Sequence, residues 1–281
     1  MRLAALALVA AALLGCRAAT GATNAVPDFD HVVVVVFENK ESASVLGAHD
    51  APTFNLYGRV YARATQYYGV AHPSLPNYLA LIAGSTFGHT TNCVDCPIGA
   101  QSLSDTIGAS GRTWKAYAEG LPSRGFLGGA SGRYTKKHNP FAYFTSITLS
   151  PARRERIVPL EELAADAKSG ALPDFSFVVP DLCSSMHDCP VRAGDLWLRR
   201  VVGPLLKLPR TAIFITFDEG ATWVRGGGHI PTLVVGTAVR PNSAFRRITN
   251  HYGLLRTIED AWQLPRLGLS ARTRPLTGIW R

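Results

Sequence analysis

The sequence predicts an α/β domain built on a mostly parallel central sheet that is flanked by helices. Two uninterrupted apolar runs, His31–Phe37 (HVVVVVF) and Thr211–Phe217 (TAIFITF), are rich in β-branched and aromatic residues, which is typical of buried strands in a parallel sheet. Strand-like and helix-like segments alternate along the chain, as they do in α/β sheets. With 281 residues, of which 47% are hydrophobic, the chain is long enough for one sizeable core.

The remaining elements are expected in chain order between and after these two strands. Short apolar runs predict further strands, and apolar residues at helical spacing predict helices, one of which is ended by Gly84. The stretch from Gly120 to Lys137 is rich in Gly, Ser and basic residues and is expected to be a loop over the site, because long loops in compact domains are usually functional. The expected strands are Tyr67–Val70, Thr113–Ala118, Asp174–Val179 and Pro231–Val235, and the expected helices are Tyr78–Ala83, Ser102–Ile107, Pro159–Lys168, Asp195–Leu208 and His251–Trp262.

The N-terminus has the layout of a secretory signal. Arg2 is followed by the apolar stretch Leu3–Leu14, which is too short to span a bilayer, and then by Gly15-Cys16. Leu13-Leu14-Gly15-Cys16 resembles a bacterial lipobox, so residues 1–16 are expected to be a lipoprotein signal with lipid on Cys16. The alternative is cleavage by ordinary signal peptidase within Ala18–Ala25. Residues 17–27 are expected to be a tether, and residues 28–281 the folded domain.

Cysteine spacing fits an exported protein. Five cysteines leave one unpaired, and setting Cys16 aside leaves the close pairs Cys93/Cys96 and Cys183/Cys189. Two local disulfides are predicted, since export favours them. A zinc site at the C-x-x-C pair, or free thiols, are the alternatives; no second C-x-x-C or suitable histidine pair accompanies it.

The net charge of +9 gives a basic surface that would attract anionic headgroups, phosphorylated substrates or nucleic acid. The basic residues are scattered, with small clusters at Arg153-Arg154 and Arg246-Arg247. The aromatic-interleaved basic module of a nucleic-acid binder is not seen. Nucleic acid is therefore not expected as a partner.

Polar side chains follow both long apolar runs at the point where each run ends. Glu38-Asn39 comes directly after the first run, and Asp218-Glu219 after the second. Ligands of open α/β sheets bind beyond the carboxyl ends of the strands, and three carboxylates with an amide are a hard, anionic ligand set suited to a divalent cation. One acid alone could be a helix cap, but two pairs in one cleft would repel each other without a cation. These residues predict a divalent-metal site.

Ser74 is the nucleophile candidate. It follows the Tyr67–Val70 run and opens a helix, where backbone N–H groups converge and favour an anion. Pro76 suits the first turn because it lacks the N–H that would go unpaired there, and Asn77 would either cap the turn or donate to a substrate oxygen. The residues alone leave open a plain N-cap serine.

The segment SLPNYLALIAGS, residues 74–85, resembles the Thr/Ser-x-Pro-Asn nucleophile helix of the alkaline phosphatase superfamily. Further segments resemble its phosphoesterase branch, which holds bacterial acid phosphatases and phosphocholine-type phospholipases C. They occur in family order over nearly the whole mature chain: Phe37–Lys40, Lys137–Phe141, Met186–Asp188, Asp195–Trp197, Phe217–Gly220 and Gly228–Pro231.

This resemblance implies an alkaline-phosphatase-like single domain in which Ser74 attacks phosphorus and forms a phosphoserine. It implies that Glu38, Asn39, Asp218 and Glu219 bind one divalent metal ion that also contacts Ser74. A second metal would use His187 and His229, together with Asp181 or Asp188.

For each of three histidines near these motifs, two roles are possible. Ser184-Ser185 stand before Met186-His187-Asp188 where the branch pattern has Asn-Asp, so His187 is either a metal ligand or a leaving-group acid that Asp188 orients. His138 is either a phosphate or acid–base residue, as the resemblance implies, or a solvated loop histidine. His72 is either a site residue or a packing residue.

The expected function is metal-dependent hydrolysis of phosphate monoesters by an exported protein of the cell envelope, lipid-anchored to a bacterial membrane. The expected partners are a small phosphorylated substrate or a lipid headgroup, and the membrane itself through Cys16. A phospholipase C acting on phosphorylated headgroups is the first alternative. The second is a non-catalytic surface lipoprotein with a degenerate site, which the Ser184-Ser185 departure would favour.

Overall fold

The structure, a computed structural model, describes residues 26–281. The expected signal 1–16, its lipobox Cys16 and residues 17–25 of the expected tether lie outside these residues. No helix of the described part is both long and apolar enough to cross a bilayer.

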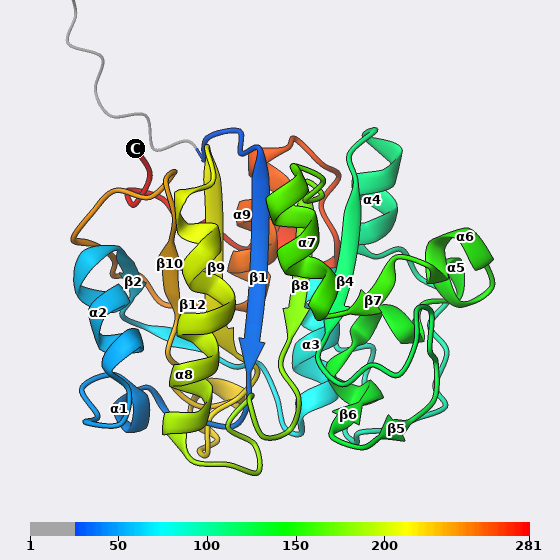
Figure 1. Ribbon diagram of the computed structural model, residues 1–281, viewed down its shortest axis with the longest axis horizontal. Coiled ribbons are helices and arrows are strands. Elements are labelled where there is room, and N and C mark those ends of the chain that lie inside the picture. Colours follow the sequence, from blue (N-terminus) through cyan, green and yellow to red (C-terminus); the bar gives the residue numbers. More distant parts are fainter. Residues whose placement is uncertain (1–25) are drawn as a thin grey trace, which may run out of the picture.

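An eight-stranded sheet runs through the middle of the molecule, with helices on both faces (Figure 1). Its strand order is β11-β2-β10-β9-β1-β8-β4-β7, and every neighbouring pair is parallel except the two that involve β10. The α/β fold with a mostly parallel sheet is therefore confirmed. The strands are β1 His31–Phe37, β2 Ala62–Ala64, β4 Trp114–Ala118, β7 Ile157–Pro159, β8 Phe175–Val179, β9 Thr211–Phe217, β10 Leu233–Val235 and β11 Ser243–Phe245.

Helices α2, α7 and α8 cover the front face of the sheet in Figure 1, and α3 and α9 lie behind it, packed against each other. Helices α7 and α8 each have a buried apolar side and exposed polar residues, as expected of a helix that covers a sheet. Behind the sheet, α9 has no exposed residue, and all residues of α3 are buried. The α-helices are α1 Ser42–Val45, α2 Pro52–Val60, α3 Ser74–Ala83, α4 Leu103–Ala109, α5 Thr145–Thr148, α6 Pro151–Arg154, α7 Glu161–Ser169, α8 Val191–Val202 and α9 His251–Ala261.

Some expected elements differ in extent. The helix predicted over Asp195–Leu208 begins earlier, as α8, and passes into a 3-10 helix at Gly203 because Pro204 cannot continue the α-helical hydrogen bonding. The loop expected between Gly120 and Lys137 contains the hairpin of β5 (Ala130–Ser131) and β6 (Tyr134–Thr135). The short pair of β3 (Tyr67–Tyr68) and β12 (Thr249–Asn250) lies outside the main sheet. The 3-10 helices are Lys136–His138, Pro140–Tyr143, Gly203–Lys207, Val224–Gly226 and Gly268–Arg272.

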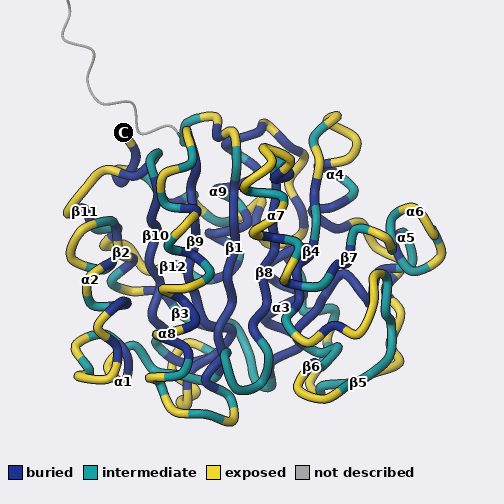
Figure 2. Tube along the Cα trace, viewed as in Figure 1, coloured by how far each residue is buried: buried dark blue, intermediate teal, exposed yellow. Residues whose placement is uncertain are grey.

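The core lies on both sides of β1 and β9, which are buried along nearly their whole length (Figure 2). In front of the sheet, the rings of Phe37 and Phe217 stack 5.4 Å apart, and Trp197 of α8 packs edge-on against Phe37. Buried Asp195 accepts hydrogen bonds from Thr53 N (2.8 Å) and Phe54 N (3.0 Å), so it satisfies the first N–H groups of α2. The Asp195–Trp197 motif is thus used for packing.

The register of the two central strands decides where the site lies. Phe37, the last residue of β1, is paired with Phe217, the last residue of β9. The polar pairs that follow these residues therefore leave the sheet side by side, at its carboxyl edge. Because β10 is antiparallel to β9, the chain enters β10 from this same edge.

Candidate active site

Three acidic side chains gather at the carboxyl edge of β1 and β9. Glu38 and Asp218 are fully buried, and Glu219 is 6% exposed. Asp218 Oδ1 accepts hydrogen bonds from Asn39 N (3.1 Å) and Glu219 N (2.6 Å), which fixes its orientation. Buried carboxyl groups this close to one another repel as anions.

Ser74 is brought to these acids by α3. Pro73 is the N-cap and Ser74 is the first helical residue, so the plain N-cap serine is not what the structure shows. The Ser74 hydroxyl, 1% exposed, donates a 3.3 Å hydrogen bond to Glu38 Oε2. The N–H groups at the start of this helix were expected to favour an anion. The Leu75 N–H does not meet this expectation, because it already donates to Asn92 Oδ1 at 2.9 Å.

Asn77 does not face the substrate side as an open donor. Its Oδ1 accepts from Val70 N (2.8 Å) and Ala71 N (3.2 Å), and its Nδ2 donates to Ala71 O (2.8 Å). The same Nδ2 also lies 3.3 Å from Pro73 O and 3.5 Å from Glu219 Oε2. These contacts hold the loop that leads into Ser74 against the acid cluster, so they fit the alternative in which Asn77 caps the turn.

Glu38 is the centre of the cluster. Besides Ser74, it accepts a hydrogen bond from the Tyr78 hydroxyl, one turn further along α3. His138 Nε2 lies 3.1 Å from Glu38 Oε2, and its ring stacks on Tyr78 with centroids 5.3 Å apart. His138 is 1% exposed, which excludes the alternative of a solvated loop histidine.

Burial raises the pKa of all three carboxyl groups. Desolvation is the main cause for each; repulsion by Glu38 adds to it for Asp218, and repulsion by Asp218 and then Glu38 brings the pKa of Glu219 to about 9. Burial also lowers the pKa of His138 well below its usual value, helped by Lys137 and His187. Both shifts favour the neutral forms of Glu38 and His138, which lie 3.1 Å apart.

Several buried polar atoms of the cluster have no hydrogen-bond partner among the described residues: Asn39 Oδ1, Asp218 Oδ2 and His138 Nε2. Such atoms are uncommon in folded proteins, and a bound ion or ordered water is one explanation for them. Two of them are hard oxygens beside carboxyl groups with raised pKa values, which is donor chemistry suited to a divalent cation. The chemistry of Glu38, Asn39, Asp218 and Glu219 thus fits a metal ion, although the oxygens of the three acids do not all lie within 4.8 Å of one another.

His187 and Asp188 form a pair on the disulfide loop that follows β8. His187 Nδ1 lies 2.6 Å from Asp188 Oδ1, and its Nε2 lies 3.4 Å from Lys137 Nζ. The His187 ring is 5.9 Å from that of His138, and its side chain is 28% exposed. The contact between His187 and Asp188 fits the alternative in which Asp188 orients a histidine acid.

The other proposed ligands of a second metal are engaged elsewhere. Asp181 Oδ1 accepts from Cys183 N (2.9 Å) and Ser184 N (2.8 Å), so it caps the turn of the disulfide loop. His229 Nε2 lies 3.1 Å from Thr65 O, and its ring packs on Tyr68. Neither side chain contacts the Glu38 cluster among the interactions of the described residues, so the structure does not assemble the predicted second site.

Two further residues lie beside the site, and only Glu41 was not considered from the sequence. His72 has both of the roles left open for it: its Nδ1 lies 2.8 Å from Glu219 Oε2, and its ring packs on Trp223 with centroids 4.4 Å apart. Glu41 holds the loop after Glu219: its Oε1 accepts from Ala221 N and from both the N–H and hydroxyl of Thr222, and its Oε2 accepts from His229 N. The only signal for Glu41 was its place three residues after Glu38, which does not reveal a contact 180 residues away.

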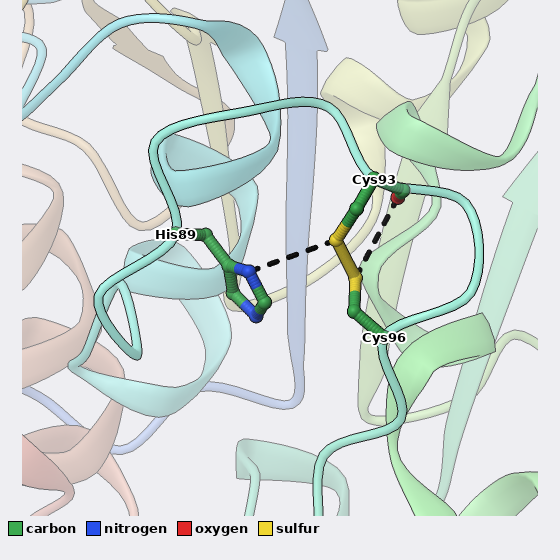
Figure 3. Close-up of side chains that lie close together, drawn as sticks. All are labelled: His89, Cys93 and Cys96. Atoms are coloured by element: carbon green, nitrogen blue, oxygen red, sulfur yellow. Dashed lines mark hydrogen bonds between the residues drawn. A yellow bond between two sulfur atoms is a disulfide. The ribbon is translucent and has the colours of Figure 1, made fainter.

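Both predicted disulfides, Cys93–Cys96 and Cys183–Cys189, are formed. Within residues 26–281, the one group of three metal-ligand side chains that converge within 4.8 Å is His89, Cys93 and Cys96 (Figure 3). Metals bind the thiolate form of cysteine, and here the disulfide takes both sulfur atoms. The alternative of a zinc site at C-x-x-C is therefore not supported.

Comparison with known proteins identifies the family of this chain. The model of the phosphoesterase family matches residues 38–265, which include every residue of the cluster. Phosphatidylinositol-3-phosphatase of Mycobacterium tuberculosis is 35% identical over 267 residues, covering 92% of this chain and 85% of that protein. Acid phosphatase of Aspergillus fumigatus is 30% identical over 224 residues, covering 73% of this chain but only 49% of that protein.

The fold is shared with proteins of much lower sequence identity. A protein of the alkaline phosphatase superfamily from Vibrio parahaemolyticus matches with a TM-score of 0.61 at 17% identity, over 86% of this chain and 69% of that one. This likeness concerns the fold alone. The family match and the phosphatase relatives lead to one conclusion: the chain belongs to the phosphoesterase family and is a hydrolase of phosphate esters.

Proposed function

We propose that this protein is a metal-dependent phosphatase that cleaves phosphate monoesters through a phosphoserine intermediate. The observation that supports this most directly is the position of the Ser74 hydroxyl. It opens the buried helix α3 and bonds Glu38 inside a cluster of three carboxyl groups, where Asp218 Oδ2 and the neighbouring Asn39 Oδ1 have no hydrogen-bond partner among the described residues. The relatives named phosphatases support monoesters as the substrate class.

In the first step, Ser74 releases its hydroxyl proton to solvent, Oγ attacks phosphorus, and the bond between phosphorus and the ester oxygen breaks. The leaving oxygen keeps the electron pair and takes a proton from His187, which Asp188 orients at 2.6 Å. In the second step, water attacks the phosphoserine, the bond between phosphorus and Oγ breaks, and phosphate is released. One proton of the water returns to His187, the other stays on the phosphate, and Oγ takes a proton from solvent to become a hydroxyl again.

Glu38, Asn39, Asp218 and Glu219 would hold the metal ion. When bound, it would favour the ionised Ser74 hydroxyl and neutralise negative charge on the phosphoryl oxygens. His138, buried between Tyr78 and His187, would contact a phosphoryl oxygen through Nε2, which lies 3.1 Å from Glu38 Oε2 but makes no well-aligned hydrogen bond within residues 26–281.

The experiment is a comparison of p-nitrophenyl phosphate with p-nitrophenyl phosphorylcholine, using protein that lacks residues 1–16. Turnover is measured with and without a chelator, and with Ser74→Ala. We expect cleavage of the monoester that the chelator abolishes and that Ser74→Ala lowers by at least about 1,000-fold, since the nucleophile is lost. Burst kinetics or trapped phosphoserine would identify the intermediate.

The phospholipase C alternative predicts the reverse preference, for the choline diester. If neither ester is cleaved with any of several divalent metals, the proposal fails, and the non-catalytic lipoprotein becomes the better description.

We further propose that the protein is exported and held at a bacterial membrane by lipid on Cys16, with no nucleic-acid partner. The two disulfides support an oxidising compartment. Metabolic labelling with a radioactive fatty acid, compared with Cys16→Ala, tests the anchor: label must be present in the native protein and absent in the variant.

A further inference from the structure

Three arginines gather around a surface hollow of about 410 Å³ at one edge of the main sheet. Arg59 lies in the last turn of α2, Arg63 is the middle residue of β2, and Arg246 directly follows β11. The parallel pairing of β2 with β11 brings the last two together, since Arg63 is opposite Ala244. We call this feature the arginine hollow.

The positive charge of the arginine hollow is not compensated within the protein. Asn242, Ser243 and other uncharged residues complete its lining, and none of its arginines is ion-paired with a carboxylate of the described residues. The undescribed residues 1–25 contain no Asp or Glu, so that segment has no acidic side chain to offer.

Other hollows of this protein are built differently. Four further cavities have arginine or lysine in their lining, and each also has at least one carboxylate, from Glu119, Asp195, Asp105 or Asp28. Charged side chains are common on edge strands, where they prevent unwanted pairing. Edge protection explains an arginine beside the edge strand β11, but it requires neither the arginine of β2, which is paired on both sides, nor the one from α2.

The chemistry of three guanidinium groups selects for clustered oxyanions. Each group is planar and permanently charged, and it offers paired donors that match two oxygens of a phosphate. We propose that the arginine hollow is a second anion site, separate from the catalytic centre, that binds molecules with several phosphate groups. It shares no residue with the Ser74 site, and it does not depend on which ester that site cleaves. The ligand is either a free polyphosphorylated solute or phospholipid headgroups at a membrane.

The test compares two double variants that each remove two positive charges. Arg63→Gln/Arg246→Gln alters the hollow, whereas Arg272→Gln/Arg274→Gln alters exposed arginines elsewhere that also lack an ion pair. Both are made in a Ser74→Ala background so that the probes are not consumed. One probe is inorganic tripolyphosphate, measured by calorimetry, and the other is phosphatidylcholine vesicles containing phosphatidic acid, measured by co-sedimentation. The same doubles with Ser74 intact must still cleave p-nitrophenyl phosphate, which shows that they fold.

We expect the hollow variant to bind at least about tenfold more weakly than the control variant, because two charge-assisted contacts are lost. A loss for tripolyphosphate supports a soluble ligand, and a loss for vesicles alone supports headgroups of a membrane. Equal affinities of the two double variants for both probes would overturn the proposal, as would failure of the Ser74→Ala parent to bind either probe.

Discussion

Asp218 is a side chain whose place in the proposed metal site lowers the stability of the metal-free protein. Its Oδ1 is satisfied by two backbone N–H groups, whereas its Oδ2 is buried without a partner, close to Glu38. Burial and Glu38 both raise its pKa well above the usual value. Stored repulsion of this kind is common at sites that bind a cation, and it disfavours the folded state when the cation is absent.

Asp218→Asn should therefore stabilise the metal-free protein while destroying its activity. The amide keeps one acceptor oxygen for both N–H groups and places a neutral donor toward Glu38. We expect the melting temperature to rise by about 2–4 °C, as about 1 kcal/mol would do for a protein of this size, and turnover to fall by at least about 100-fold. Calorimetry in a chelator and a p-nitrophenyl phosphate assay check both parts. A lower melting temperature would show that Asp218 is not under electrostatic stress.

In the proposed mechanism, Asp188 acts on the substrate only through His187. The rate change on replacing Asp188 should therefore depend on the leaving group. Asp188→Asn should slow the cleavage of alkyl phosphates by roughly 10- to 100-fold, because their leaving oxygen needs a proton. It should leave p-nitrophenyl phosphate within about threefold, since p-nitrophenolate departs without protonation. The measurement is kcat/KM for both esters in Asp188→Asn and in His187→Asn. Equal losses on the two esters would assign the pair a merely structural role.

At the scale of elements, α3 is fixed at both ends by its neighbours. Near its start, Ser74 and, one turn later, Tyr78 donate hydrogen bonds to Glu38. The helix ends at Gly84, which has a left-handed conformation with φ of 67°. A side chain on Gly84 would overlap the carbonyl oxygen of Leu267. The glycine is thus needed for its conformation and also for the close approach of another segment.

Gly84→Ala should destabilise the protein more than the matched change at the end of α7. Gly170 has the same conformation, with φ of 74°, but nothing lies within 4 Å of an added Cβ. We expect Gly170→Ala to cost about 1 kcal/mol for its backbone conformation and Gly84→Ala to cost about 2 kcal/mol or more, because of the added overlap. Urea unfolding of both variants measures the difference. Equal costs would mean that the Leu267 segment moves away freely.

At the scale of the whole molecule, the buried acids make stability depend on pH and on metal. Their pKa values are raised in the folded state, that of Glu219 from 4.5 to about 9, so the folded protein holds protons that the unfolded chain has released. Such groups contribute stability below pH about 4.5, and this contribution is lost as the pH rises toward 9.

The metal-free protein should accordingly melt at progressively lower temperature between pH 7 and pH 9. Adding Mg²⁺, Mn²⁺ or Zn²⁺ should raise the melting temperature, and most at the upper end, because the cation replaces the protons. Scanning calorimetry with and without a chelator measures both effects. Asp218→Asn should flatten the slope; a slope that is absent in the native protein would contradict the raised pKa values.

The sequence by itself determined the long strands, the polar pairs after them, the nucleophile helix and the disulfide pairing. Each of these depends on local chemistry: β-branched runs allow little but buried strand, and close cysteine pairs can reach each other without help from the fold. Three-residue strands such as β2, β7 and β11 were not predicted, because so few residues carry no periodicity and form a strand only where a neighbour supplies hydrogen-bond partners.

Only the tertiary structure decided which side chains face the site and which ones hold loops in place. Asn77 and Asp181 turned out to hold loops, while His72 and Glu41 joined the surroundings of the site. A side chain's role depends on which backbone groups lie within about 3 Å of it, and for Glu41 those groups belong to residues 180 or more positions away. The register of β1 against β9 is what turned two separate sequence motifs into one cluster of acids.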